Sequence, residues 1–184
     1  MTRSDDTAAD RPKNRLRPFI WGGLAGLLMI PLVAMRFTRE VNWDETDFIV
    51  MGLMLAAVGG GYELTIRLSD NVLYRFGAAV AVLTGFLLVW ANLAVGFIGN
   101  EDNVWNLLFA GMLLLMIVGA IVSRFRARGL ALTLAAGAVI QCAGLVAAAV
   151  AGQNVPPGPA VVFTLLWLLS AGLFRAAHQQ SKGA

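Results

Sequence analysis

The sequence predicts an all-α protein, a polytopic transmembrane bundle of six helices with both ends of the chain in the cytoplasm. Three observations predict this fold. Hydrophobic residues make up 58% of the 184 residues and charged residues only 14%, against about 45–50% and about 25% in ordinary globular chains. The apolar residues fall into six long runs, and Lys and Arg concentrate on alternate connections between the runs.

The lengths of the six runs match membrane spans. A hydrocarbon core about 30 Å thick requires about 20 apolar residues per helix. Six helices therefore use most of the chain, and we expect one transmembrane domain, residues 19–175, between cytoplasmic tails at 1–18 and 176–184. The polar first tail mixes both charge signs and is expected to be disordered. The expected spans are 19–35, 47–66, 76–98, 104–122, 130–151 and 160–174.

The placement of Lys and Arg predicts the orientation, because cytoplasmic loops carry an excess of these residues. With the N-terminus inside, only Arg36 and Arg39 of the 14 cationic residues face outside. Membrane topology thus accounts for the net charge of +3, and we expect no nucleic acid partner. The expected partner is the lipid bilayer, and other membrane proteins or a second copy of the chain stay open. The outer acidic residues are Glu40, Asp44, Glu45, Asp47, Glu101 and Asp102.

Most familiar membrane enzymes are excluded because the sequence lacks the catalytic residues that they need within the membrane spans. The single histidine, His178, lies in the C-terminal tail, which excludes bis-histidine haem and histidine-rich metal sites. The two lysines, Lys13 and Lys182, lie in the tails, so no buried Schiff base can form. The sequence contains neither HExxH nor a glycine-rich phosphate loop followed by Lys. We therefore expect no cofactor and no catalytic residues.

Three polar residues inside the spans, Glu63, Gln141 and Asn92, are the candidate substrate-binding residues. Ionisable residues within a membrane are functional candidates. Arg67 follows Glu63 at i+4, however, so an interfacial ion pair is the favoured interpretation. The amides of Gln141 and Asn92 are expected to form hydrogen bonds between helices, as such groups usually do.

Small residues recur at the spacing that lets helices approach closely. We expect these stripes to contact other helices; a helix of the same chain is favoured, and one of another chain stays open. We expect Trp90, Trp167 and Cys142 to pack in the interior. The glycine triplet at 59–61 predicts a bend or a close approach. The stripes are Gly22 and Gly26; Gly77, Ala81 and Gly85; and Gly144, Ala148 and Gly152.

The outer loops, residues 36–48 and 99–103, gather carboxylates that suit a hard cation. Calcium takes about six to eight oxygen ligands. The candidate metal ligands are Glu101, Asp102, Asp44 and Glu45. The loops lack EF-hand spacing, and a solvated acidic rim is the favoured interpretation.

Three segments carry a resemblance: VNWDETDF at 41–48, WANLAVGFIGNEDN at 90–103 and SRFRARG at 123–129. They resemble those of an uncharacterised family of small proteobacterial multi-pass inner-membrane proteins. The resemblance implies a bacterial inner (plasma) membrane and the same helical plan. It supplies no activity, cofactor or catalytic residue.

Two main hypotheses for the function follow. The first is an integral membrane protein without a catalytic site that acts as an accessory, assembly or structural protein through packing with partners. The alternative is a small transporter or channel with a polar path through Glu63, Gln141 and Asn92, in which the two halves could form an inverted repeat. A third, an enzyme acting on a quinone or a lipid, has the least support. A water-filled cavity at Gln141 would favour the transporter, and a solid core there would favour the first hypothesis.

Overall fold

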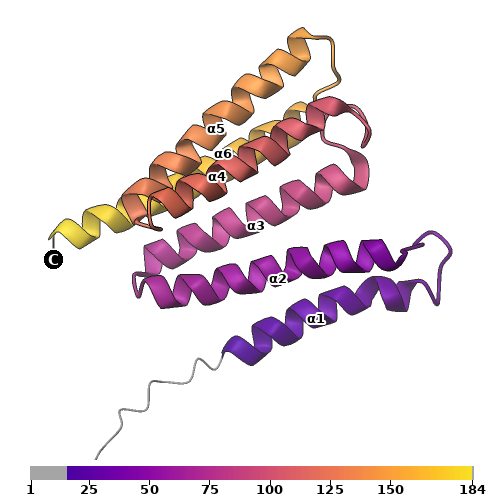
Figure 1. The fold of residues 1–184 in the computed structure, drawn as a ribbon, viewed down its shortest axis with the longest axis horizontal. Helices are drawn as coiled ribbons and strands as arrows, with labels where there is room; N and C mark the ends of the chain where they lie inside the picture. The colour runs from indigo at the N-terminus through magenta and orange to yellow at the C-terminus, as the bar shows by residue number, and fades with distance from the viewer. Residues whose placement is uncertain (1–15, 184) are drawn as a thin grey trace, which may run out of the picture. The chain divides into compact units, whose positions relative to one another are not determined.

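The computed structural model describes residues 16–183, which form six α-helices and one short 3-10 helix, with no strand among them (Figure 1). All six spans of the described chain are long and apolar enough to cross a membrane. The predicted all-helical class and the six predicted spans are therefore confirmed. The helices are α1 (Leu16–Ala34), α2 (Glu45–Leu68), α3 (Val72–Val95), α4 (Leu107–Val122), α5 (Ala127–Val150) and α6 (Pro157–Gly183), with η1 (Val104–Asn106) leading into α4.

The helix ends lie where capping residues place them. α3 begins at Val72 because the Asn71 side chain accepts a hydrogen bond from the backbone N–H of Tyr74 at 3.0 Å. It ends at Val95 because Gly96 adopts a φ of 70°, in the left-handed region that glycine favours. The span predicted from hydropathy, residues 76–98, therefore began four residues too late and ended three residues too late.

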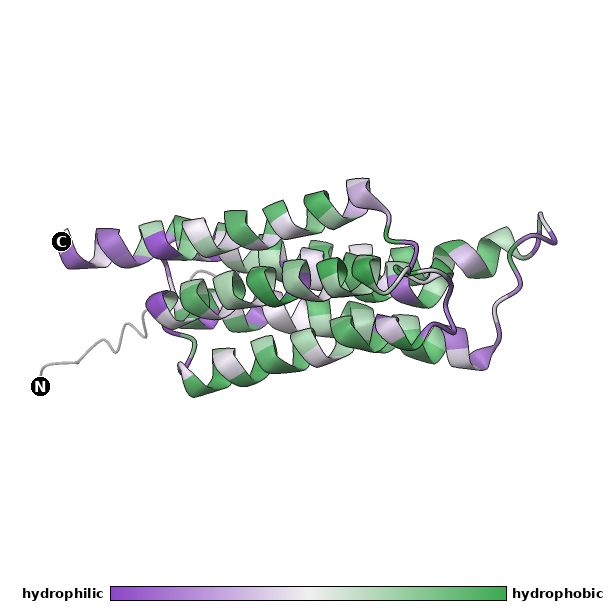
Figure 2. Cartoon of the chain, turned by 90° about the horizontal axis from the view of Figure 1, so that it is seen from above, coloured by the Kyte–Doolittle hydropathy of each residue, from purple (hydrophilic) through white to green (hydrophobic). Residues whose placement is uncertain are grey.

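The outermost helices extend into the predicted tails. α1 starts at Leu16, so three residues assigned to the N-terminal tail are helical, while residues 1–15 of that tail lie outside the described residues. α6 continues to Gly183 through the segment assigned to the C-terminal tail. Figure 2 shows that this end of α6 is hydrophilic, although the helix is unbroken.

A capping box starts α2. The backbone N–H of Asp47 donates to Oδ1 of Asp44, and the backbone N–H of Asp44 donates to Oδ2 of Asp47, both at 3.0 Å. Carboxylates are also favourable at this end of a helix because the helix dipole is positive there. Two of the acidic residues of the 36–48 loop are thus used to begin a helix.

The chain divides into two compact units, residues 1–59 and 60–184, which we describe separately. In the first unit, Trp21 of α1 lies so close to Gly59 of α2 that a Cβ at Gly59 would lie 2.8 Å from the indole ring. This glycine therefore permits the predicted close approach. The Gly22 and Gly26 stripe faces open space instead, so its predicted contact with another helix of the same chain was wrong.

The second unit is built around α6, which packs against both α3 and α5, while α4 packs against α5 (Figure 1). Contact between α3 and α4 is slight, although they are consecutive in the chain. The core side chains Leu88, Phe109, Trp167 and Phe174 come from three of these helices and are at most 2% exposed. The four helices thus share one interior but leave a gap between α3 and α4.

The small-residue stripes of α3 and α5 contact neighbouring helices, as predicted. A Cβ at Gly77 would lie 3.2 Å from the Phe174 ring of α6, and a Cβ at Gly144 would run into Leu108 of α4. Near the start of the unit, a Cβ at Gly61 would lie 2.9 Å from Val82 of α3. Gly152 instead ends α5 with a φ of 78° and has nothing within 4 Å of its Cβ position.

Candidate functional site

Gln141 lies halfway along α5, has no exposed surface, and forms hydrogen bonds with both ends of its amide. Its Nε2 donates to Oγ1 of Thr164 at 2.9 Å, and its Oε1 accepts from the indole Nε1 of Trp167 at 3.1 Å. Both partners lie on α6. The predicted interhelical role of this amide is therefore confirmed, and its two polar atoms are occupied within the chain.

Helix geometry explains why Thr164 and Trp167 reach the same amide. Residues three apart lie on one face of a helix, and α6 turns this face toward α5. Trp167 is 2% exposed, so its predicted packing role is confirmed. Trp90 is 47% exposed, and Cys142 is also exposed, with its Sγ 3.6 Å from Oγ1 of Thr164. The predicted burial of these two residues was wrong, although Cys142 still contacts α6 through Thr164.

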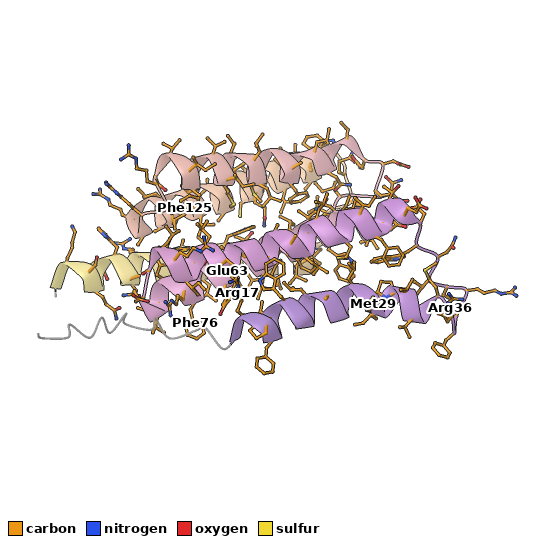
Figure 3. All side chains as sticks on the ribbon, turned by 60° about the horizontal axis from the view of Figure 1, so that its bottom comes forward. Arg17, Met29, Arg36, Glu63, Phe76 and Phe125 are labelled. Atoms are coloured by element: carbon orange, nitrogen blue, oxygen red, sulfur yellow. The ribbon has the colours of Figure 1, made fainter. Side chains whose placement is uncertain are left out.

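Glu63 lies on the last turns of α2, at the end that joins α3 (Figure 3). Its Oε2 lies 3.8 Å from Nη2 of Arg67, with side-chain exposures of 14% and 72%. The predicted i,i+4 ion pair is therefore present. Its guanidinium partner is largely exposed at the end of the helix.

Asn92 lies on the last turn of α3, at the end of that helix away from its connection with α2. Its Nδ2 donates to the backbone oxygen of Leu88 at 2.9 Å. Its Oδ1 is buried and has no hydrogen-bond partner among the described residues. Asn92 is therefore only half satisfied, in contrast to Gln141.

The three candidate substrate-binding residues occupy separate environments. Glu63 lies on α2 near its connection to α3, and Asn92 lies on the last turn of α3, far from that connection. Gln141 is enclosed between α5 and α6. No hydrogen bond links any two of the three within the described residues.

The acidic loops show no assembled metal site. Within residues 16–183, no group of three or more His, Cys, Asp and Glu side chains is placed to hold a metal ion. Asp44 is engaged in the capping box of α2, and Glu45 is the first residue of that helix. Glu101 and Asp102 lie together in the loop between α3 and α4. A cation shared by these four residues stays a prediction.

A groove of about 440 Å³ lies between α3 and α4, beside this second loop. Its polar residues are Asn92 of α3, Glu101, Asp102 and Asn103 of the loop, and Asn106 at the end of η1. Its apolar wall is formed by Val89 and Leu93 of α3 and by Ala110 and Leu113 of α4, with Leu107 and Phe109 nearer the loop. The slight contact between the two helices leaves this space open.

Asn106 organises the loop above the groove and was not identified from the sequence. Its Oδ1 accepts the backbone N–H groups of Phe97 and Ile98 at 3.1 and 2.8 Å, and its Nδ2 donates to the backbone oxygen of Asn100 at 2.7 Å. Asn103 ties the loop to the connection between α5 and α6 by donating to Gln153 at 2.7 Å. The density of asparagine in residues 100–106 was the available signal.

Comparison of the chain with protein-family models, curated proteins and solved structures finds no match. The interpretation of this groove and of the buried amide therefore rests on their own chemistry.

Proposed function

We propose that this chain is a multi-pass protein of a bacterial inner membrane that acts as an accessory or assembly protein by packing against other membrane proteins. The observation that carries the proposal is the closed hydrogen bonding of Gln141. An amide at mid-span that contacted a solute would need free polar atoms beside a cavity. Here both amide atoms bind Thr164 and Trp167, and the side chain is fully buried.

The charge distribution of the second unit supports an inside location for both chain ends. In residues 60–183, Arg67 and Arg75 flank the connection of α2 and α3, and Arg124, Arg126 and Arg128 lie at that of α4 and α5. Hydrogen bonds from Asn71 to Gln180 and from Tyr74 to the Phe125 backbone oxygen join these connections and the end of α6. The positive-inside rule assigns this basic end to the cytoplasm.

The alternative, a small transporter or channel, requires a continuous polar path through Glu63, Asn92 and Gln141. Glu63 pairs with Arg67 near the basic end, Asn92 lies near the other end, and Gln141 is sealed between two helices. These separate environments favour a packing role over a conduction path.

The exposed apolar faces offer surfaces for partners as well as for lipid. Ile117 of α4 and Leu165 of α6 are each 58% exposed. Where lipid tails are as apolar as the side chains, helices associate through close packing rather than through a hydrophobic driving force.

Photo-crosslinking in native membranes tests the proposal. A photoreactive amino acid placed at Ile117 or Leu165 is expected to form a protein adduct of defined mass, whereas one at Leu88, which is 0% exposed, is expected to form none. Lipid adducts alone at the exposed positions would contradict the proposal. So would a solute or proton flux in proteoliposomes that Glu63→Gln abolishes, because it would establish the transporter.

A further inference from the structure

The groove between α3 and α4 has apolar walls, and the charged residues that line it are all acidic. Glu101 and Asp102 place two carboxylates at one end of it, next to Asn92. Its walls, from Val89 and Leu93 to Leu113, are apolar. A groove of this shape at the end of a membrane span matches the headgroup and the first part of the acyl chain of a lipid.

Each asparagine side-chain amide that lines the groove already donates to a partner within the chain. Nδ2 of Asn92 donates to Leu88, Nδ2 of Asn106 to Asn100, and Nδ2 of Asn103 to Gln153. The acceptor Oδ1 of Asn92 is buried without a partner among the described residues. A buried acceptor without a partner is unfavourable. A ligand that brings a donor to this oxygen would remove that cost.

The charge of the rim defines that ligand further. No Lys or Arg is among the residues that line the groove. The cationic side chains of residues 60–183 lie toward the opposite end of the helices, where Arg75 and Arg124 flank the inner connections. An anionic headgroup would meet two carboxylates and no cation, so the rim complements a positive group.

We propose that the groove binds one phospholipid whose headgroup ends in a primary ammonium. The ammonium has three N–H donors, which match the carboxylates of Glu101 and Asp102 and the free Oδ1 of Asn92. The acyl chain lies along Val89, Leu93 and Leu113. This inference rests on the membrane location proposed above and not on the accessory role, so either can fail alone.

The test measures lipid binding to the purified full-length chain by native mass spectrometry and by thermal stability in detergent. The lipids are phosphatidylethanolamine, phosphatidylcholine, which lacks the N–H donors, and the anionic phosphatidylglycerol, at equal mole fraction. The expected result is one bound phosphatidylethanolamine per chain, held about tenfold more tightly than either other lipid, and a higher melting temperature with that lipid alone. Equal binding of all three lipids, or preference for phosphatidylglycerol, would overturn the proposal.

Substitutions in the groove test whether the lipid binds there. Glu101→Gln with Asp102→Asn is expected to abolish the preference for phosphatidylethanolamine while leaving the fold intact, because both residues are exposed. Ala110→Phe is expected to fill the groove and remove the bound lipid. Gly111→Phe is its control, since a side chain there meets nothing within 4 Å.

Three results would refute this assignment. One is an unchanged preference in the double variant, and another is equal loss of lipid in the two phenylalanine variants. The third is a calcium-induced rise in melting temperature without lipid, lost in the double variant, because the carboxylates would then form a cation site.

Discussion

The indole Nε1 of Trp167 on α6 donates a hydrogen bond to the Oε1 of Gln141 on α5, 3.1 Å away and fully buried. Trp167→Phe removes this donor and leaves a buried acceptor. We expect the change to lower the free energy of unfolding by about 0.6–1.7 kcal/mol, the range for hydrogen bonds between membrane helices. Unfolding in mixed detergent micelles measures it. Trp90→Phe, at an exposed position, is the control and is expected to change stability by less than about 0.5 kcal/mol.

A double-variant cycle separates this hydrogen bond from the loss of indole volume. If the bond exists in the membrane, Trp167→Phe costs less when Gln141→Leu is already present. Equal cost in both backgrounds would mean that only packing had been lost.

Small side chains on one face of α3 should control its packing. Ala81 is partly buried against the core, whereas Ala79 is exposed. Ala81→Leu is expected to cost about 1–3 kcal/mol because it overpacks this contact. Ala79→Leu is expected to have little effect. Equal tolerance at the two positions, measured by thermal unfolding in detergent, would show that this face of α3 does not contact a helix.

Gly129, in the first turn of α5, should resist replacement. A Cβ at this position would run into the Cβ of Ser123, which cannot move away as the tip of a long side chain could. We expect Gly129→Ala to cost about 1–3 kcal/mol. In the same assay Gly111→Ala, with open space at its Cβ, is expected to gain up to about 1 kcal/mol from helix propensity. A silent Gly129→Ala would contradict the close packing of this turn.

Glu63 should tolerate neutralisation. Its partner Arg67 is 72% exposed and 3.8 Å away, although the Glu63 side chain itself is only 14% exposed. Solvent at the guanidinium screens the pair, and helix pairs at this spacing contribute about 0.3–0.5 kcal/mol when exposed. We expect Glu63→Gln and Arg67→Gln to be equally mild in stability and in complementation of the native phenotype. Loss of complementation by a well-folded Glu63→Gln, with Arg67→Gln silent, would instead favour the transporter.

The topology predicts opposite signals from two reporter fusions. A fusion after Asp102 lies in the connection of α3 and α4, and one after Arg126 in the connection of α4 and α5. One helix separates them, so a reporter that is active only outside the cytoplasm is expected to respond at Asp102 alone. Equal activity at both sites would contradict a spanning α4.

The number and approximate limits of the helices were predictable because the length of an apolar run is a local property of the sequence. The partners of the polar residues were not. Gln141 was recognisable as a polar residue in a span, but Thr164 and Trp167 lie 23 and 26 residues away, and their pairing depends on how α5 meets α6.

The partners of the small residues could not be predicted from the sequence either. Gly77 and Gly22 look alike in the sequence, yet Gly77 packs against Phe174, and Gly22 faces open space. The composition indicates which positions permit close approach. Which of them a neighbouring helix uses depends on the arrangement of the whole unit.

The two hydrogen bonds of Gln141 also have a consequence for the insertion of α5 and α6 into the bilayer during synthesis. Both of its partners are translated later, and Trp167 follows by 26 residues, a delay of roughly one to five seconds at ribosomal rates of about 5–20 residues per second. Until then, α5 alone would carry an unpaired amide into hydrocarbon, which is unfavourable. The hairpin of α5 and α6 is therefore the smallest segment that can leave the translocation machinery with this amide paired.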